Sequence, residues 1–97
     1  MIRHCVLLTF TPDTDPGHAA FVADELSGLP AEIPEILAYT VGPDLGLHPA
    51  NSSLAVVADF DDRAGYLAYR DHPAHRAIIA ALITPHLAGR AAVQFTI

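Results

Sequence analysis

The sequence predicts a small α+β domain in which a four-stranded antiparallel sheet carries two helices on one face. Three observations predict this class. Four segments show strand-like side-chain patterns, two segments show helix-like apolar spacing, and they follow one another in the order βαββαβ. A chain of 97 residues fits one domain, and no repeat or linker divides it, so residues 1–97 are expected to form a single domain.

The first strand is expected over residues 2–10, where side chains alternate between two faces and neither face is polar. One face holds Ile2, His4, Val6, Leu8 and Phe10, and the other holds Arg3, Cys5, Leu7 and Thr9. A turn over 11–14 follows, after which Asp15 is a candidate N-cap and Pro16 suits the first helical position. The first helix is expected to end near Gly28.

The middle of the chain predicts a turn and two strands. Residues 29–34 contain two prolines four positions apart, which forbids a long helix and indicates one tight turn. The second strand is expected from about Glu35 to Gly42. A loop rich in glycine and proline over 42–51 then leads to the third strand at Ser53 to Phe60.

The last third predicts an interrupted helical region and a fourth strand. Either Asp61 or Asp62 caps the first helical part, and after a proline break a helix continues from Ala74 to Leu87. Gly89 is the expected stop, and residues 91–97 form the last strand. The whole order is that of a split βαβ, ferredoxin-like fold.

The sheet face away from the helices is expected to be apolar as well. On the first strand Cys5 and Leu7 lie opposite His4, and on the third strand Ala55 and Val57 lie opposite Leu54. Apolar residues make up 52% of the chain, which is generous for so small a domain. We therefore expect a homodimer in which two open sheet faces pack together.

Composition excludes several classes of function. The net charge is −6, and the five basic residues are scattered arginines, so nucleic acid is not an expected partner. No apolar run of about 18 residues and no basic amphipathic face is present, so no membrane partner is expected. A single cysteine permits no internal disulfide, which favours the cytoplasm as the location of the protein. Cys5 is expected to be a buried side chain that only fills space within its strand.

Histidine is the residue type that points to chemistry. No glycine-rich phosphate loop, cysteine cluster or serine nucleophile elbow is present. His72-Pro73-Ala74-His75 follows closely on Tyr69, and if this region lies on the sheet, His75 and Tyr69 project toward His4. The expected apolar walls of this pocket are Val6, Leu8, Leu54 and Val56. Two imidazoles and a phenol around an apolar pocket suit proton abstraction α to a carbonyl.

Simpler interpretations of the same residues stay open. His75 can be only a partly exposed residue at a helix start, and His72 can be merely a helix cap. Tyr66 and Tyr69 can be core aromatics.

A metal site is a further alternative. It would combine His72 and His75 with either His86 or His4. No Asp or Glu lies at a sequence spacing that would add a carboxylate ligand to these histidines, so a metal ion is not expected. No other cofactor is expected either. The remaining histidines, His18 and His48, are expected to face solvent.

Three segments carry a resemblance to a known family. Ile2-Arg3-His4-Cys5-Val6-Leu7-Leu8, Ile33-Pro34-Glu35-Ile36 and Tyr69-Arg70-Asp71-His72-Pro73-Ala74-His75 together resemble the stress-responsive A/B barrel (Dabb) family. The resemblance covers nearly the whole chain. It implies a dimeric α+β barrel, in agreement with the two apolar sheet faces.

Within that family the chain resembles the plant olivetolic acid cyclase type, a cofactor-free polyketide cyclase. The resemblance implies that His75 is the acid/base, that Tyr69 assists it, and that His4 takes part. The last strand of that type carries an aspartate, whereas this chain has Gln94 at the corresponding position.

Two functions therefore remain as hypotheses. The first is a cofactor-free cyclase, lyase or isomerase acting on a small β-keto substrate, with catalytic residues His75, Tyr69 and His4. The substrate is expected to contact His72, Val6, Leu8, Leu54, Val56 and Gln94. The alternative is a non-catalytic, stress-responsive dimer that binds a small apolar ligand.

Overall fold

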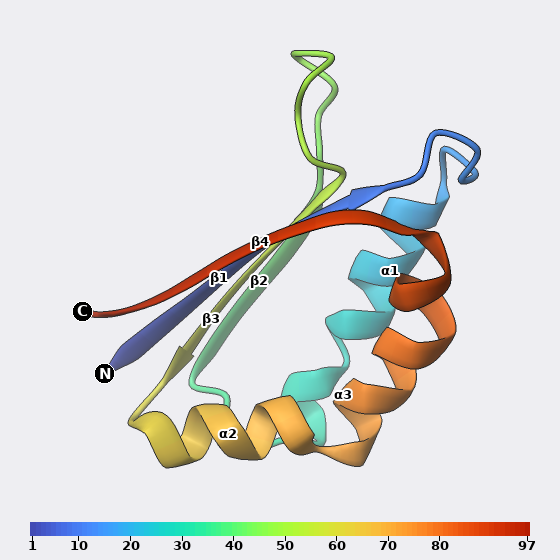
Figure 1. Ribbon diagram of the computed structural model, residues 1–97. Coiled ribbons are helices and arrows are strands. Elements are labelled where there is room, and N and C mark those ends of the chain that lie inside the picture. Colours follow the sequence, from blue (N-terminus) through green and yellow to red (C-terminus); the bar gives the residue numbers. More distant parts are fainter.

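The structure, a computed structural model, describes all of residues 1–97 and has the expected order of strands (Figure 1). Strand β1 (Ile2–Phe10) lies in the middle of the sheet, between β3 (Leu54–Phe60) and β4 (Leu87–Thr96). Strand β2 (Ala38–Pro43) lies outside β3, which gives the antiparallel order β2-β3-β1-β4. This is the ferredoxin-like topology that the sequence predicts.

Helices cover one face of the sheet. They are α1 (His18–Leu26), α2 (Arg63–Asp71) and α3 (Pro73–Ile78), and Figure 1 shows α2 across one end of the sheet with α1 and α3 beside each other. The second of the two expected helical regions is thus present as two helices, α2 and α3, separated at the expected proline break. Because Pro73 holds His72 in an extended conformation (φ −62°, ψ 135°), the second helical region is divided. None of these helices has the length and apolar character needed to cross a lipid bilayer.

Two side chains cap the divided helices. The Asp62 carboxylate accepts a hydrogen bond from the Gly65 amide at 2.9 Å, so Asp62 and not Asp61 caps α2. The Nδ1 atom of His72 accepts a hydrogen bond from the Ala74 amide at 3.1 Å at the start of α3. Both caps satisfy amides that a helix leaves without an internal partner.

Replacing Asp62 with alanine is expected to lower the free energy of unfolding by about 1 kcal/mol, because the first turn of α2 loses its cap. Urea unfolding measures the change. The matched control is Asp61→Ala, which removes a neighbouring exposed acid that makes no capping bond. Equal losses in the two variants would contradict the assigned cap.

The first helix and the second strand start later than expected. Helix α1 starts at His18, because the Asp15 carboxylate accepts a hydrogen bond from the Gly17 amide at 2.8 Å. This bond closes a turn before the helix. Strand β2 starts at Ala38 and not at Glu35, since residues 34–35 still form a turn.

The C-terminal elements differ more strongly from expectation. The helix from residue 74 is α-helical only to Ile78 and continues as a π-helical turn (Ile79–Ile83) and a 3₁₀ turn (Thr84–His86). Pro85 has no amide hydrogen with which to extend the α-helical ladder. Strand β4 then runs from Leu87, with Gly89 inside it opposite Thr9, so the expected helix stop at Gly89 and the strand start at 91 are wrong. The long central strand β1 supplies pairing partners as far as Phe10.

His18 is also placed differently from expectation. Its Nε2 atom lies 2.7 Å from the carbonyl oxygen of Leu82 in the π-helical turn, and its ring lies 4.1 Å from that of His86. His18 is therefore half-buried and does not face solvent, whereas His48 is exposed in the loop after β2, as expected.

The apolar core lies between the sheet and the helices. Its most deeply buried large side chains are Phe60, Leu26, Leu29, Ile33, Leu54 and Val22. The register of the sheet sets which residues share this helix side: His4 of β1 lies opposite Gln94 of β4, and Leu8 lies opposite Arg90. Because directly opposed residues point to the same side of a sheet, these β4 side chains face the helix layer.

The other sheet face is apolar and open. Leu7, Val93 and Phe95 remain 46%, 54% and 44% exposed, and they share this open face with smaller apolar side chains. At one end Arg3 donates two hydrogen bonds to the Asp59 carboxylate, at 2.8 and 2.9 Å. Cys5, expected as a buried side chain, also lies on this face and is half-buried in the single chain.

Candidate functional site

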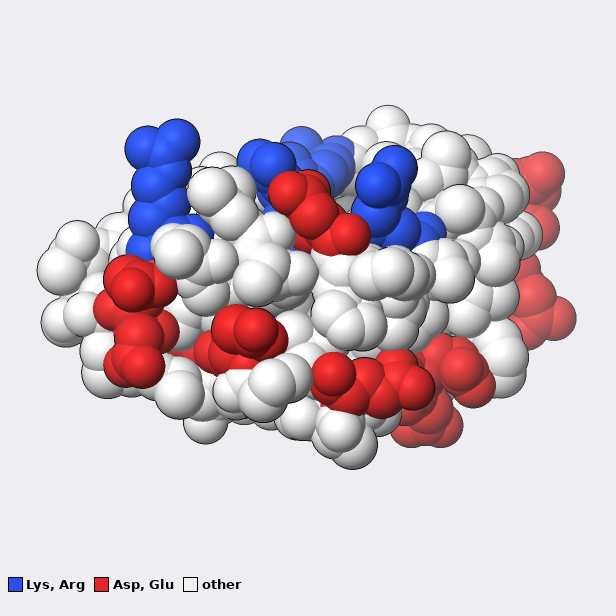
Figure 2. All heavy atoms as spheres, turned by 90° about the horizontal axis from the view of Figure 1, so that it is seen from below, with Lys and Arg blue, Asp and Glu red and all other residues white.

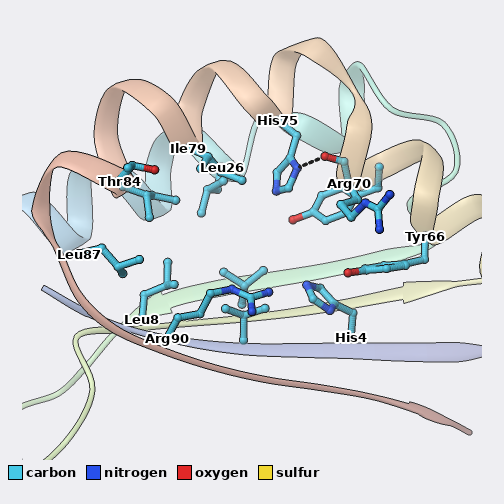
Figure 3. Close-up of a pocket in the computed structure, with 14 residues that line it drawn as sticks. His4, Leu8, Leu26, Tyr66, Arg70, His75, Ile79, Thr84, Leu87 and Arg90 are labelled. Atoms are coloured by element: carbon cyan, nitrogen blue, oxygen red, sulfur yellow. Dashed lines mark hydrogen bonds between the residues drawn. The ribbon is translucent and has the colours of Figure 1, made fainter.

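A cavity of about 190 Å³ lies between the helix layer and strands β1, β3 and β4. Figure 3 shows His75 reaching into it from the helices and His4 and Arg90 reaching into it from the sheet. The lining residues are His4, Val6, Leu8, Leu26, Val56, Tyr66, Tyr69, Arg70, His75, Ile79, Ile83, Thr84, Leu87 and Arg90. One end of the cavity is thus rich in aliphatic side chains, and the other holds the imidazoles and phenols.

His75 lies in the first turn of α3 and is only 9% exposed. Its Nδ1 atom lies 3.1 Å from the backbone carbonyl of Arg70, which can only accept a hydrogen bond, so Nδ1 carries the proton. The break at Pro73 leaves such carbonyls at the end of α2 without helical partners. The Nε2 atom of His75 therefore keeps a free lone pair.

Burial lowers the pKa of His75 below its ordinary value, although the bond to the Arg70 carbonyl opposes the shift. The imidazole is therefore neutral at pH 7. A neutral imidazole with an unprotonated Nε2 atom is chemically a base.

Tyr69 stacks on His75, with ring centroids 4.1 Å apart, and is 2% exposed. Its hydroxyl lies 2.9 Å from that of Tyr39 on β2. Burial raises the pKa of both phenols, so both keep their protons. When Tyr39 donates to Tyr69, the proton of Tyr69 is free to point into the cavity. Sequence reasoning did not select Tyr39, because its place on the helix-facing side of β2, opposite Ala58, depends on the register between β2 and β3.

His4 is 4% exposed and lies 4.9 Å from Tyr66, centroid to centroid. The side-chain amide of Gln94 donates a hydrogen bond to its Nδ1 atom at 2.8 Å, so the ring proton of neutral His4 is on Nε2. Burial, and after it the charge of Arg90, lowers the pKa of His4 to about 4. His4 is thus a neutral hydrogen-bond donor, whereas His75 is a neutral acceptor.

Stability is expected to fall in acid because of His4. Its pKa is lower in the folded chain than the value of about 6.5 expected when unfolded, so its contribution is complete above pH 6.5 and is lost as the pH falls toward 4. Over that window the loss is roughly 3 kcal/mol. Urea unfolding at several pH values measures it.

The variant His4→Phe keeps a ring but cannot take up a proton, and it should show a shallower fall in stability over the same window. The matched control is His48→Phe in the exposed loop, which should behave like the wild type. Identical pH dependence in His4→Phe and the wild type would refute the account.

The cavity also contains charged and aromatic groups that sequence reasoning did not select, namely Tyr66, Arg70 and Arg90. Tyr66 was considered only as a core aromatic. Arg90 was missed because the last strand was expected to start at residue 91. On the face shown in Figure 2, arginines lie mostly along one edge and the carboxylates mostly along the other.

Not every expected site residue lines the cavity. His4, Tyr69, His75, Val6, Leu8 and Val56 do, but His72 and Leu54 do not. The His72 ring is occupied as the cap of α3, and Leu54, 1% exposed, is packed into the core. Gln94 reaches the site through its bond to His4 and is not a lining residue. No three His, Cys, Asp or Glu side chains are gathered closely enough to hold a metal ion.

Comparison with known proteins places this architecture in a family. The family described as Stress Responsive A/B Barrel Domain (Dabb) matches residues 2–97. A dimeric ferredoxin-like protein of unknown function from Thermobifida fusca YX is 48% identical, with 99% of this chain and 90% of that one covered and a TM-score of 0.88. None of the curated proteins matches the sequence.

More distant solved structures share the fold. A hydroxynitrile lyase from Passiflora edulis is 17% identical, covering 99% of this chain and 92% of its own, with a TM-score of 0.81. An antibiotic biosynthesis monooxygenase is 16% identical, covering 100% of this chain and 98% of its own, also with a TM-score of 0.81. At these identities the likeness concerns the fold alone.

Proposed function

The chain belongs to the stress responsive A/B barrel domain (Dabb) family, and on that basis we propose that it is a cofactor-free enzyme that removes a proton α to a carbonyl group. The reaction is of the cyclase or lyase type, and the substrate is a small β-keto compound. The single observation that carries the proposal is the pair of hydrogen-bond partners of the two buried imidazoles: the Arg70 carbonyl at Nδ1 of His75 implies a free Nε2 lone pair there, and the Gln94 amide at Nδ1 of His4 implies an Nε2 proton.

The proposed step balances without any added reagent. The Nε2 atom of His75 takes the α proton, and the electron pair of the C–H bond moves into the carbonyl to form an enolate. Tyr69 and His4 donate hydrogen bonds to the enolate oxygen. The enolate carbon then attacks a second carbonyl of the same molecule, and the proton on His75 moves to the alkoxide that this aldol step creates.

Gln94 supports this division of roles. An aspartate at this position would accept a hydrogen bond from an Nδ1–H group of His4, whereas the Gln94 amide donates a hydrogen bond to Nδ1 and leaves the ring proton on Nε2. Gln94 therefore orients His4 as a donor toward the enolate oxygen. The departure from the cyclase pattern changes the role of His4 and does not remove it.

We also propose that the protein is a homodimer whose subunits pack through their open sheet faces. The exposed Leu7, Val93 and Phe95 favour this arrangement, because monomers rarely leave such a contiguous apolar surface in water. The description of the Thermobifida fusca relative as dimeric, at 48% identity, supports it. The pairing of two such sheets would make a dimeric α+β barrel.

A non-catalytic dimer that binds a small apolar ligand is the second candidate. The aliphatic end of the cavity, formed by residues such as Leu26, Ile79 and Leu87, favours it. This candidate predicts saturable binding without any product, and it predicts that His75 can be replaced without chemical consequence.

Liquid chromatography of products tests the proposal. Wild-type protein is incubated with a β-keto thioester of four ketide units and with the linear tetraketide itself, because in these an aldol step can close a six-membered ring. The expected result is a product of intramolecular carbon–carbon bond formation that is absent without protein. Unchanged substrates that nevertheless bind would move the assignment to the ligand-binding dimer.

A further inference from the structure

The side chains that line the cavity include positively charged groups but no negatively charged ones. The chain has eleven acidic residues and a net charge of −6, yet no carboxylate is among the lining residues, whereas Arg70 and Arg90 both are. A cavity with cations and no acids attracts an anion and repels a second cation. The charge of the site is thus opposite in sign to that of the whole chain.

The two arginines are not equivalent. Arg70 forms a bidentate ion pair with its neighbour Asp71, Nε to Oδ1 at 2.9 Å and Nη2 to Oδ2 at 3.2 Å, so much of its charge is compensated. The other ion pair of the protein joins Arg3 to Asp59. Arg90 therefore lines the cavity with no carboxylate partner.

The position of Arg90 is set by the sheet. Its place opposite Leu8 puts it on the helix side of β4, and Figure 3 shows its guanidinium lying over the sheet toward His4. His4 does not compete with it as a cation, because burial and Arg90 itself keep the pKa of His4 low. A guanidinium and the Nε2–H group of His4 therefore converge from the sheet side, while the basic Nε2 atom of His75 faces them from the helix side.

We propose that Arg90 is a substrate-binding residue that holds a carboxylate group, so that this site takes a small keto acid and not a neutral ketone. The inference rests on the proposed proton-transfer function and specifies its substrate class. A carboxylate on Arg90 places the rest of the molecule either along the aliphatic end near Leu8 and Leu87 or against His75. A planar guanidinium suits a carboxylate because it can donate two parallel hydrogen bonds.

Binding of hexanoate and hexanamide tests the role of Arg90. The two probes have the same size and differ in charge, and neither can react, so binding is followed by protein NMR titration without turnover. Wild-type protein should bind hexanoate roughly tenfold more tightly than hexanamide, as expected for hydrogen bonds to one solvent-exposed cation at the cavity wall. The variant Arg90→Gln should bind both probes alike, at the affinity of hexanamide for the wild type.

Two further variants complete the test. Arg90→Lys keeps the charge and should retain part of the preference for hexanoate, and Arg63→Gln, which removes an exposed arginine outside the cavity, should behave like the wild type. The proposal would be overturned if Arg90→Gln kept the full preference for hexanoate. It would also be overturned if the wild type bound the two probes with equal affinity, or bound neither of them. Because no reaction is needed, these outcomes leave the role of His75 untouched, and loss of activity in His75→Ala leaves the binding preference intact.

Discussion

The variant His75→Ala is expected to form cyclised product about 10²- to 10⁴-fold more slowly than the wild type, which is the usual contribution of a general base. The reason is the free lone pair on Nε2, which no neighbouring group can replace, since the phenols of Tyr69 and Tyr39 keep their protons. Initial rates measured by chromatography give the factor.

The control for this prediction is His48→Ala, which removes an exposed histidine and should leave the rate unchanged. Because His75 is buried and bonds to the Arg70 carbonyl, thermal unfolding must show that the variant is folded. If alanine destabilises α3 too far, His75→Gln fills the space without supplying a base. Product formation at the wild-type rate in a folded His75 variant would eliminate the mechanism.

The variant Leu7→Asp is expected to convert the dimer into monomers, with the dimer dissociation constant raised by at least about 100-fold. Leu7 lies on the central strand of the open face and is 46% exposed in the single chain. A carboxylate there would be buried in the interface without a partner, at a cost of several kcal/mol. Sedimentation velocity over a range of protein concentrations measures the shift.

The matched control is Leu47→Asp, which makes the same substitution at a side chain that is 73% exposed in the loop after β2. This variant should sediment like the wild type. A wild type that is monomeric at micromolar concentration, or two variants with equal dissociation constants, would place the interface elsewhere or remove it.

Local patterns were sufficient for much of this fold. Alternation along residues 2–10 assigned His4 to the helix side and Leu7 to the open side, because side-chain direction in a strand has a period of two. Pro73 likewise indicates where the second helical region breaks, since the restriction on His72 acts between neighbours. These rules depend on adjacent residues and need no knowledge of the tertiary structure.

The misplaced elements depend on distant partners. The start of β4 at Leu87 is set by pairing with the end of β1, nearly eighty positions earlier, and this pairing overrides the expected stop at Gly89. The contact between His18 and the Leu82 carbonyl requires the π-helical turn, which no local pattern indicated. Helix and strand boundaries that such long-range contacts decide cannot be predicted from the secondary-structure propensities of single residues.

The same distinction applies to the site. The convergence of His4, Tyr69 and His75 follows from placing one helical region on one strand, and the sequence predicts it. The bond between Gln94 and His4 depends on the register between β1 and β4, and the bond between Tyr39 and Tyr69 depends on how α2 lies across the end of the sheet. These two contacts set the protonation of the site and are visible only in the folded chain.

The most direct test of the central claim is proton exchange at the α carbon, followed by NMR in D₂O with acetoacetate, a short β-keto acid. The measurement is made cold and at pH 7, where His75, with its lowered pKa, is neutral, and the exchange without protein is measured alongside. The account predicts exchange that rises in proportion to wild-type protein and stays at the protein-free rate with His75→Ala. Equal exchange with both proteins, or none above the protein-free rate with the wild type, would contradict it.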